Sequence, residues 1–596
     1  MYFNVFGQRV SRTKYKEMAA AAKNRRELVA AQLSRRDLMK AGLLTGAGYL
    51  ISKGGLSARA KSPAPLEQAA SPPVTPFIEP LHIIPVKEAV GVLQPAPSVT
   101  PLPHEGRTRP HQALNVFPPK KFYKVRQHVA PSRVHPELPE QALWGFDGMS
   151  PGPTYVARYG EPILVRNFNE LPPDNGGFGL DSVTTHLHNG HTPSESDGFP
   201  CDFFEIGQFY DQHYPNVLAG ILSTHPGTGD IRESLSTLWY HDHRVDFTSQ
   251  NTYKGLLGFY LLFNEFDTGN ETTGFHLPSF PEFDVPMVFA DKVFDEDGRL
   301  FFDLFNIDGI LGDRFMVNGK IQPFFQVHPR RYRFRWLNVG PSRFQEFFLT
   351  DPGNSAAHNL YWQIANDGNL LPKPVQVESV RIGVAERMDV IVDFSQFAGR
   401  SIYLENRLKQ LDGRGPVPAP DDILPAGTGN LVMRFDVVLP AVQDQSDDPA
   451  RITKFYDLPD TAVEPAVVRT FRFDRLNGEW SINGTFMDCN RTRFRVKQNT
   501  AEHWVLGNFS GDWQHPIHIH LEEHQILTRN RVPPPTVEVS RKDVTRLRQN
   551  ERVELFFRFR DFTGRYPLHC HNMIHEDHAM MLRWDIEPDG DTNITP

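Results

Sequence analysis

Four short segments each place two histidines two residues apart, and this pattern constrains the fold more than any other feature of the sequence. The four pairs are His186/His188, His241/His243, His518/His520 and His569/His571. Residues two apart on a β-strand point to the same face, so each pair on a strand projects two imidazoles into one volume. Together the pairs offer eight nitrogen ligands. The pattern therefore indicates strands that carry a metal site.

The rest of the chain also favours β-structure. After its first hundred residues the sequence is rich in Val, Phe, Thr, Pro and Gly, with apolar runs separated by turn residues. Long amphipathic helical patterns are scarce. A chain of 596 residues is too long to form a single hydrophobic core, because domains usually contain roughly 100 to 200 residues. We therefore expect an all-β protein with roughly two to four domains.

Composition divides the chain into an N-terminal signal (1–60), a Pro-rich extended arm (61–121) and three β-rich blocks. We call these the first block (122–265), the second block (280–440) and the third block (464–596). The apolar run 255–262 is typical of a buried strand. Alternating charged and apolar residues predict half-buried strands at 331–337 and 389–394. The acidic stretch 440–463 is expected to be a linker.

The N-terminal signal resembles a twin-arginine export sequence. Residues 34–40 read Ser-Arg-Arg-Asp-Leu-Met-Lys, an apolar stretch follows at 41–51, and Ala58-Arg59-Ala60 has the small-x-small form of a cleavage site. The alternative is a charged N-terminal helix without special meaning. The apolar stretch is too short to span a bilayer. We expect a protein exported to the periplasm or the cell exterior, without a transmembrane segment in the mature chain.

The net charge argues against one class of partner. A formal charge of -8 and a pI near 6.3 provide no basic field for phosphates, so nucleic acid is excluded as an expected partner. The chain has only three cysteines, so a disulfide scaffold is not expected either.

Cys570 distinguishes between the metals that imidazole alone would accept. It lies between His569 and His571, so on an extended backbone its thiolate points away from these two rings and serves a different metal. His515 is the unpaired histidine of its motif, and His575 and Met580 follow in a predicted loop. Two His, one Cys and a weak axial Met form the blue-copper electron-transfer set. An electron taken up at Cys570 could then cross adjacent peptides to the metals of the histidine pairs, where dioxygen is reduced.

Taken in order, these segments resemble the four copper-binding motifs of the multicopper oxidase family, over most of the chain after residue 75. Segments 144–148, 151–154, 239–240, 317–320 and 385–387 resemble its spore-coat laccase and bilirubin oxidase branch. The resemblance implies three consecutive cupredoxin-like Greek-key β-barrel domains, with a trinuclear cluster between the first and third. It implies one type 1, one type 2 and two type 3 copper ions, with dioxygen as the electron acceptor.

The resemblance also implies a role for each ligand. Type 2 copper would take His186 and His518, and type 1 copper would take His515, Cys570 and His575 with Met580 as the axial ligand. The type 3 pair would take six histidines, namely His188, His241, His243, His520, His569 and His571. One departure lies in the first motif, where Asn189 separates the second histidine from Gly190 and makes a different local turn possible.

Three further residues match functional positions of the family. Asp197 and Glu576 match acidic residues that relay protons or tune the cluster, although Asp197 could instead only stabilise a loop. Trp513 resembles a tryptophan that borders type 1 copper, although a core aromatic is the alternative.

His191, His524 and His578 fit no ligand position and are expected to line the access route or to form hydrogen bonds. Cys201 and Cys489 could form a disulfide in an exported protein, with two free thiols as the default.

The expected function is a laccase-like oxidoreductase, a monomer, that oxidises phenols, aromatic amines or bilirubin-like pigments in one-electron steps and reduces dioxygen to water. One alternative is a metallo-oxidase for Mn(II) or another low-valent metal ion. A remote alternative is a non-catalytic cupredoxin scaffold, which should lack ligands. An electron-transfer protein would not need the eight extra histidines, and a two-domain nitrite reductase would not need all four pairs.

Overall fold

The computed structural model describes residues 2–5, 8–11, 70–304, 306–354, 359–476 and 478–596. Strands make up 41% and helices 5% of the structure, so the predicted all-β class is confirmed. Most of the predicted signal lies outside the described residues, apart from an antiparallel hairpin of β1 (Tyr2–Val5) and β2 (Gln8–Ser11). Among the described residues, no helix is long and apolar enough to cross a lipid bilayer.

Two four-stranded sheets form the first block. One has the order β4 (Gln141–Phe146), β3 (Lys121–Ser132), β6 (Ile163–Asn169), β8 (Phe209–Tyr214). The other has the order β5 (Gly152–Arg158), β10 (Leu257–Phe263), β9 (Thr237–Asp242), β7 (Thr185–His188). Every residue of β10 is buried, as the apolar run in the sequence predicts. The short helix α3 (Thr248–Lys254) connects β9 to β10.

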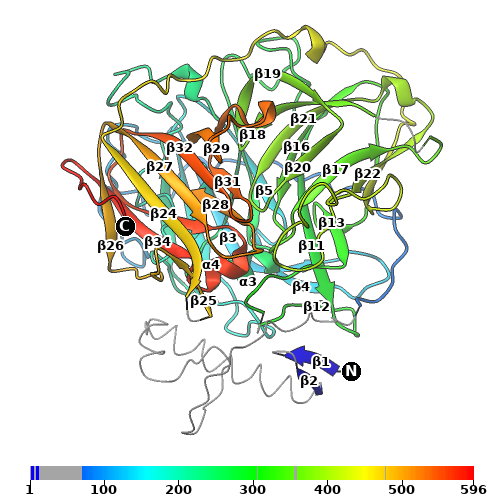
Figure 1. Cartoon of the computed structure of the whole chain (residues 1–596), viewed down its shortest axis with the longest axis horizontal. Helices are drawn as coiled ribbons and strands as arrows, with labels where there is room; N and C mark the ends of the chain where they lie inside the picture. The colour runs from blue at the N-terminus through cyan, green and yellow to red at the C-terminus, as the bar shows by residue number, and fades with distance from the viewer. Residues whose placement is uncertain (1, 6–7, 12–69, 305, 355–358, 477) are drawn as a thin grey trace.

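The second block, drawn in green in Figure 1, has a large and a small sheet. The large sheet has the order β14 (Lys320–Ile321), β13 (Arg314–Val317), β11 (Asp284–Phe294), β16 (Arg331–Asn338), β21 (Arg387–Asp393), β18 (Tyr361–Asn366), β19 (Asn369–Val377), and β12 (Leu300–Phe301) pairs with β11. The small sheet has the order β15 (Phe324–Gln326), β23 (Asn430–Asp436), β22 (Ser401–Asn406), β17 (Gln345–Thr350), β20 (Ser379–Ile382).

The third block, in yellow to red in Figure 1, again pairs two sheets. One has the order β25 (Glu479–Ile482), β24 (Val467–Leu476), β27 (Thr500–Asn508), β32 (Arg552–Phe559), β29 (His524–Arg529), β30 (Arg541–Lys542). The other has the order β26 (Thr492–Lys497), β34 (Met581–Glu587), β33 (Gly564–Cys570), β28 (His515–Ile519), β31 (Val544–Leu547). A short helix, α4 (Met573–Asp577), lies between β33 and β34. Single 3-10 turns occur at η1 (Ile231–Glu233), η2 (Ser395–Phe397), η3 (Pro449–Arg451) and η4 (Thr536–Glu538).

Strand pairing within the blocks sets the positions of the histidine motifs. β7 pairs with β9 so that His186 lies opposite His241, and β28 pairs with β33 so that His518 lies opposite His569. In each motif the first histidine lies on a strand, and the second lies at the end of that strand or one residue beyond it. The helices α3 and α4, which pack together near the centre of Figure 1, adjoin the second and fourth motifs.

The prediction of half-buried strands at 331–337 and 389–394 is wrong in its burial. β16 and β21 form there, but all residues of β16 except Arg331 are buried. Arg333 and Arg335 lie within the protein because they form ion pairs with Asp389 and Asp284, both fully buried. Paired charges can occupy a core position that alternation alone would assign to solvent.

The default expectation of free thiols at Cys201 and Cys489 is also wrong. The two cysteines form a disulfide with a Cα–Cα distance of 6.1 Å, across 288 residues of sequence. Sequence spacing cannot reveal such a pair, because folding alone brings the first and third blocks together. Among the described residues Cys570 is the free cysteine.

The described part of the Pro-rich arm lies along the two nearest blocks. Backbone hydrogen bonds connect Leu81 to Phe324 in β15 and Val90 to Phe122 in β3. Further along the arm, the side-chain amide of Gln112 donates to the carbonyl of Thr563 in the third block. The exact boundaries of the arm and of the three blocks stay predictions.

Candidate metal centre

One group of possible ligands joins a cysteine to two histidines inside the third block. Cys570 ends β33, His515 begins β28, and His575 lies in α4. The Cys570 Sγ lies 3.4 Å from Nδ1 of His515 and 3.7 Å from Nδ1 of His575, and these two nitrogens are 3.1 Å apart. All three side chains are fully buried. One sulfur and two imidazole nitrogens thus converge in the arrangement that suits blue copper.

A helix, not the predicted loop, carries His575. The side chain of Asn572 caps α4 by accepting the N–H of Ile574 at 3.3 Å, which favours a helical turn. Because consecutive residues of a helix point in different directions, His575 faces Cys570 while Glu576 faces the histidine cluster. One short element therefore serves both groups of possible ligands.

Met580 lies just before β34 and is fully buried. Its carbonyl accepts the N–H of Cys570 at 3.0 Å, and its own N–H donates to the carbonyl of His575. These two bonds hold the backbone of Met580 next to Cys570. Its role as the axial ligand stays a prediction.

Eight buried histidines gather where the first and third blocks meet. We call them the histidine cluster. Their ligand atoms fall into three groups, two of which share His188: His188/His241/His571, His243/His520/His569 and His186/His188/His518. In the second group the three Nε2 atoms lie 3.2 to 3.3 Å apart. The Nε2 atoms of His186 and His518 lie 3.4 Å apart. Each group takes residues from both blocks.

The chemistry of these nitrogens fits metal ions. Within the described part of the chain, both ring nitrogens of His571 and Nε2 of His241 are buried without a hydrogen-bond partner, which is uncommon for buried polar atoms. Burial lowers the pKa of His241 and of His515 to about 3, so both rings are neutral, the form that binds metal. Burial also raises the pKa of the Cys570 thiol, so a nearby cation would be needed to hold the thiolate.

The two acidic residues singled out in the sequence both touch the histidine cluster. Asp197 Oδ2 lies 2.7 Å from Nδ1 of His520, and its carbonyl accepts from Nδ1 of His186 at 2.5 Å. The two oxygens of Glu576 lie 3.2 Å from Nδ1 of His243 and of His569. Carboxylates at Nδ1 leave Nε2 free to face a metal. Burial raises the pKa of Asp197 well above its ordinary value.

Three residues near these ligand groups were not predicted from the sequence. Asp543 Oδ2 lies 3.0 Å from Nε2 of His188. The ring of Trp480 lies 4.0 Å from the ring of His575, and the hydroxyl of Ser510 lies 2.7 Å from Nε2 of His515. No spacing rule marks these residues, because each approaches its histidine only through the tertiary fold.

Trp513 lies beside the cysteine site, where its ring packs against Trp480. Its ring packs edge-on against Trp480 at 5.2 Å, and Trp480 in turn contacts the ring of His515. The guanidinium groups of Arg414 and Arg475 lie 4.7 Å and 5.3 Å from the centre of the Trp513 ring. Trp480 therefore packs against Trp513 and against both histidines.

The three histidines that fit no ligand position form hydrogen bonds, as expected. His191 pairs with Asp561 at 2.8 Å, and His524 and His578 bond to Thr545 and to the carbonyl of Ile574. Asn189 adopts a left-handed φ of 72°, which asparagine tolerates better than most residues. The insertion in the first motif is thus accommodated by an asparagine turn.

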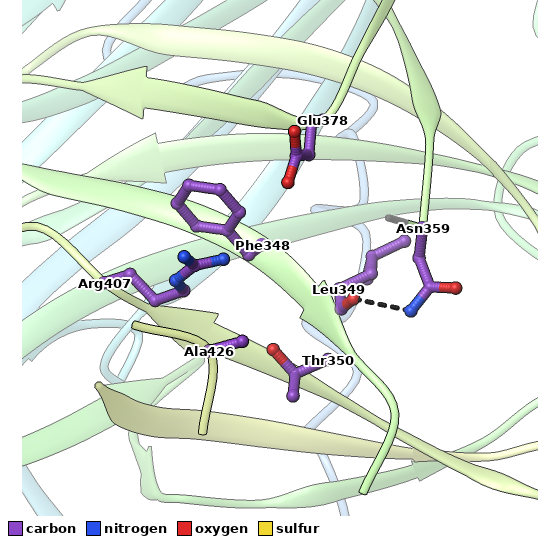
Figure 2. A pocket seen from close by; sticks show the side chains of 7 residues that line it. All are labelled: Phe348, Leu349, Thr350, Asn359, Glu378, Arg407 and Ala426. Carbon is purple, nitrogen blue, oxygen red and sulfur yellow. Dashed lines mark hydrogen bonds between the residues drawn. The ribbon is translucent and has the colours of Figure 1, made fainter. Parts of the chain in front are cut away.

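A separate small pocket lies in the second block (Figure 2). Its lining is Phe348, Leu349, Thr350, Asn359, Glu378, Arg407 and Ala426. None of these residues is a histidine or cysteine, and none belongs to the ligand groups above. The guanidinium of Arg407 lies 4.0 Å from the centre of the Phe348 ring.

Comparison with known proteins gives a consistent result. Residues 460–590 match the family model described as multicopper oxidase. The chain is 34% identical to a bilirubin oxidase of Albifimbria verrucaria, across 88% of this chain and 84% of that protein. It is 30% identical to a laccase of Bacillus subtilis, across 78% of this chain and 94% of that protein.

Solved structures support the same fold. A laccase from Pediococcus acidilactici superposes with a TM-score of 0.67 at 21% identity, across 87% of this chain and 95% of that chain. A multicopper oxidase from Aquifex aeolicus superposes with a TM-score of 0.66 at 22% identity, across 79% of this chain and 97% of that chain. The histidine and cysteine groups fit the copper that this family requires. The chain therefore belongs to the multicopper oxidases, as a laccase-like oxidoreductase that uses dioxygen as its electron acceptor.

Proposed function

We propose that the chain holds four copper ions, with each predicted ligand in its predicted role. His515, Cys570 and His575 would hold type 1 copper, with Met580 as the axial ligand. The groups His188/His241/His571 and His243/His520/His569 would hold the type 3 pair. His186 with His518 would hold type 2 copper. The convergence of separate ligand groups from two distant parts of the chain supports this assignment.

The position of Cys570 between two cluster histidines is the observation that carries the proposed reaction. When bound, copper supplies one-electron redox chemistry at the cysteine site and dioxygen reduction at the cluster. Cys570 belongs to one ligand group, while His569 and His571 each belong to another. An electron would therefore cross only the peptide units that join these three residues. Four such transfers supply the electrons that convert one dioxygen into two waters.

Asp197 and Glu576 would hold and deliver the protons that dioxygen reduction consumes. Both are buried, and both contact Nδ1 atoms of the histidine cluster. Asp197→Asn and Glu576→Gln should lower turnover and shift its pH profile while the blue colour persists. Glu195→Gln is the control, because Glu195 is a buried carboxylate of the same segment that bonds to Gln112. Unchanged turnover in both test variants would contradict the role.

Aromatic compounds are the donors that the cysteine site supports best. The ring of Trp480 packs against the rings of His515 and His575, and the ring of Trp513 packs against Trp480. The nearby carboxylates of Asp308 and Asp512 form ion pairs with Arg475 and Arg414. Aromatic side chains can stack against a phenol, an aromatic amine or a pigment such as bilirubin. A metallo-oxidase for Mn(II) is the second candidate, and a carboxylate cluster beside His515 or His575 would favour it.

Oxygen uptake with a phenol, an azo dye, bilirubin and Mn(II) tests the donor class. We expect turnover with the aromatic donors to exceed turnover with Mn(II). Trp513→Ala should raise the KM for aromatic donors, whereas Trp513→Phe should retain most of the affinity. A preference for Mn(II), or an unchanged KM in the alanine variant, would contradict the proposal.

Three further proposals concern the whole chain. Export through the twin-arginine signal would place the protein in the periplasm or outside the cell. The three blocks would be three domains bounded at 122–265, 280–440 and 464–596. The protein would act as a monomer, because all ligand groups are supplied by one chain. Fractionation of cells and light scattering of the purified protein test location and oligomeric state.

A further inference from the structure

The second block supplies none of the histidines described above, yet its residues reach the cluster at a buried junction. The turn between β18 and β19 is the contact point. The carbonyl of Asp367 accepts the side-chain N–H of Asn189 at 2.6 Å, and its carboxylate accepts the N–H of Val544 at 3.2 Å. The carbonyl of Gly368 accepts the N–H of Ser236 at 2.8 Å. This turn therefore touches the first and third blocks at once.

Arg387, the first residue of β21, binds a carboxylate at this junction with both arms of its guanidinium. Its Nη1 and Nη2 donate to the two oxygens of Asp543 at 2.9 Å and 3.0 Å. The same two nitrogens donate to the carbonyls of Ala385 at 2.8 Å and Asp367 at 2.9 Å. The arginine side chain is fully buried. Such a two-pronged, charge-assisted pair fixes both the place and the rotation of a carboxylate.

Asp543 in turn contacts two histidines of the cluster. Its Oδ2 lies 3.0 Å from Nε2 of His188, and its carbonyl accepts from Nδ1 of His518 at 3.0 Å. A ring nitrogen that faces an acceptor carries the proton, so the other nitrogen is available to a metal. The hydrogen bond to the carbonyl leaves Nε2 of His518 to face His186 in the cluster. The carboxylate of Asp543 lies against the Nε2 edge of the His188 ring without forming a hydrogen bond among the described residues, so Nδ1 of that ring is the nitrogen left for a metal.

We propose that Arg387 is a positioning residue for the histidine cluster. Its guanidinium sets the rotation of Asp543, and Asp543 selects which nitrogen of His188 faces the metal. The second block, although it supplies no histidine to the cluster, would thereby control copper binding between the other two. This inference rests on the proposed role of His188 as a copper ligand.

The fork of two parallel N–H groups is the property that the role requires. A lysine at 387 would keep the positive charge but would offer a single ammonium, so the rotation of Asp543 would no longer be fixed. Arg335 provides a matched control. It is equally buried on β16 of the same sheet and binds both oxygens of Asp284, at 2.8 Å and 2.6 Å. The Arg335–Asp284 pair does not include Asp543 or His188.

The test compares Arg387→Lys with Arg335→Lys in copper binding. Copper is removed from each full-length protein and returned in the presence of a competing chelator. Copper content and electron paramagnetic resonance report the histidine cluster, and the blue absorption reports the cysteine site. We expect Arg387→Lys to weaken copper binding at the cluster about 10- to 100-fold, the usual effect of losing a partner of a metal ligand. The blue absorption should persist, and Arg335→Lys should bind copper at the cluster as the wild type does.

Wild-type copper affinity and an unchanged resonance spectrum in Arg387→Lys would overturn the inference, as would an equal loss in Arg335→Lys. If Arg387→Lys does not fold, Asp543→Asn replaces it, and wild-type affinity in that variant would overturn the inference. Where both fold, the double variant should lose no more than Asp543→Asn alone, because both act through one contact. Wild-type protein whose cluster binds no copper would instead overturn the proposed function.

Discussion

The side chain of Cys570 and the two histidines that flank it leave β33 in opposite directions, so three consecutive residues contribute to three ligand groups. Cys570 is buried against His515 and His575, on the side of the third block's own core. His569 and His571 face histidines of the first block. A change at residue 570 should therefore affect one metal site and spare the other.

The variant Cys570→Ser tests this separation. Serine lacks the sulfur that produces the intense blue colour, so blue absorption and turnover should both be lost. Copper content should fall by about one ion per chain, because the histidine cluster keeps all its ligands. Absorption spectroscopy, elemental analysis and oxygen uptake measure these three quantities. Retained blue colour, or complete loss of copper, would contradict the assignment.

The ligand residues could be predicted because β-structure has a period of two, which is visible in His186/His188 and its equivalents. Asp543 and Trp480 could not be predicted in this way. Each is a common residue type with no local pattern, and each meets its histidine only after distant strands have packed. The sequence therefore reveals ligands more readily than it reveals the groups that orient them.

At the scale of an element, α4 is the point where both sites depend on one local structure. His575 and Glu576 are consecutive residues of this short helix, and Asn572 caps its N-terminus. No sequence pattern indicates a helix here, because five residues are too few for a periodic pattern. Strand periodicity, by contrast, correctly located β10, β16 and β21, and failed only on the burial of paired arginines.

Removal of the cap should disturb both sites together. Asn572→Ala should lower the free energy of unfolding by about 0.5–2 kcal/mol, the usual value of an N-cap side chain. It should also shift the blue absorption, because His575 would no longer be held toward Cys570. Asn572→Asp keeps the oxygen acceptor at the cap but loses the side-chain N–H that donates to the carbonyl of Gly413, so it separates the effect of the cap from that bond. Chemical denaturation and absorption spectra measure both effects, and an alanine variant equal to the wild type would refute the role of the cap.

At the scale of the whole molecule, buried ion pairs hold the first and third blocks together. Arg541 of the third block pairs with Glu233 of the first block at 2.8 Å and with Glu523 at 3.2 Å. Burial raises the pKa of Glu523 to about 7, with further contributions from Glu233 and Glu522, although Arg541 acts to lower it. One oxygen of Glu523 has no hydrogen-bond partner among the residues that the structure describes. This carboxyl group is therefore a source of instability at alkaline pH.

The sign of the effect follows from the two pKa values of Glu523. The folded value of about 7 exceeds the ordinary value of 4.5. The contribution of this carboxyl group to the free energy of unfolding is therefore fully present below pH 4.5 and is lost as the pH rises from 4.5 through 7. Glu523→Gln should be more stable than the wild type at pH above 7, by about 3 kcal/mol. The difference should vanish below pH 4.5. Melting temperatures measured across this range test the prediction.

Glu538→Gln is the control with the opposite sign. Burial alone would raise the pKa of Glu538, but Arg529 and Arg546 lower it to about 2. Its contribution to stability is therefore present at neutral pH and is lost as pH falls toward 2. This variant should be less stable than the wild type at neutral pH. The prediction for Glu523 fails if both variants change stability in the same direction at pH 8.

The disulfide between Cys201 and Cys489 restrains the same two blocks covalently, across 288 residues of sequence. Bridges that close long loops restrict the unfolded chain, and loss of a native one typically costs about 2–5 kcal/mol. Cys201→Ser combined with Cys489→Ser should therefore lower the melting temperature. The blue absorption should persist, because Arg565 of the third block still pairs with Asp202 and both ligand groups are intact. Wild-type protein treated with a reducing thiol should match the double variant, and an unchanged melting temperature in both would mean that the packing of the blocks alone sets their stability.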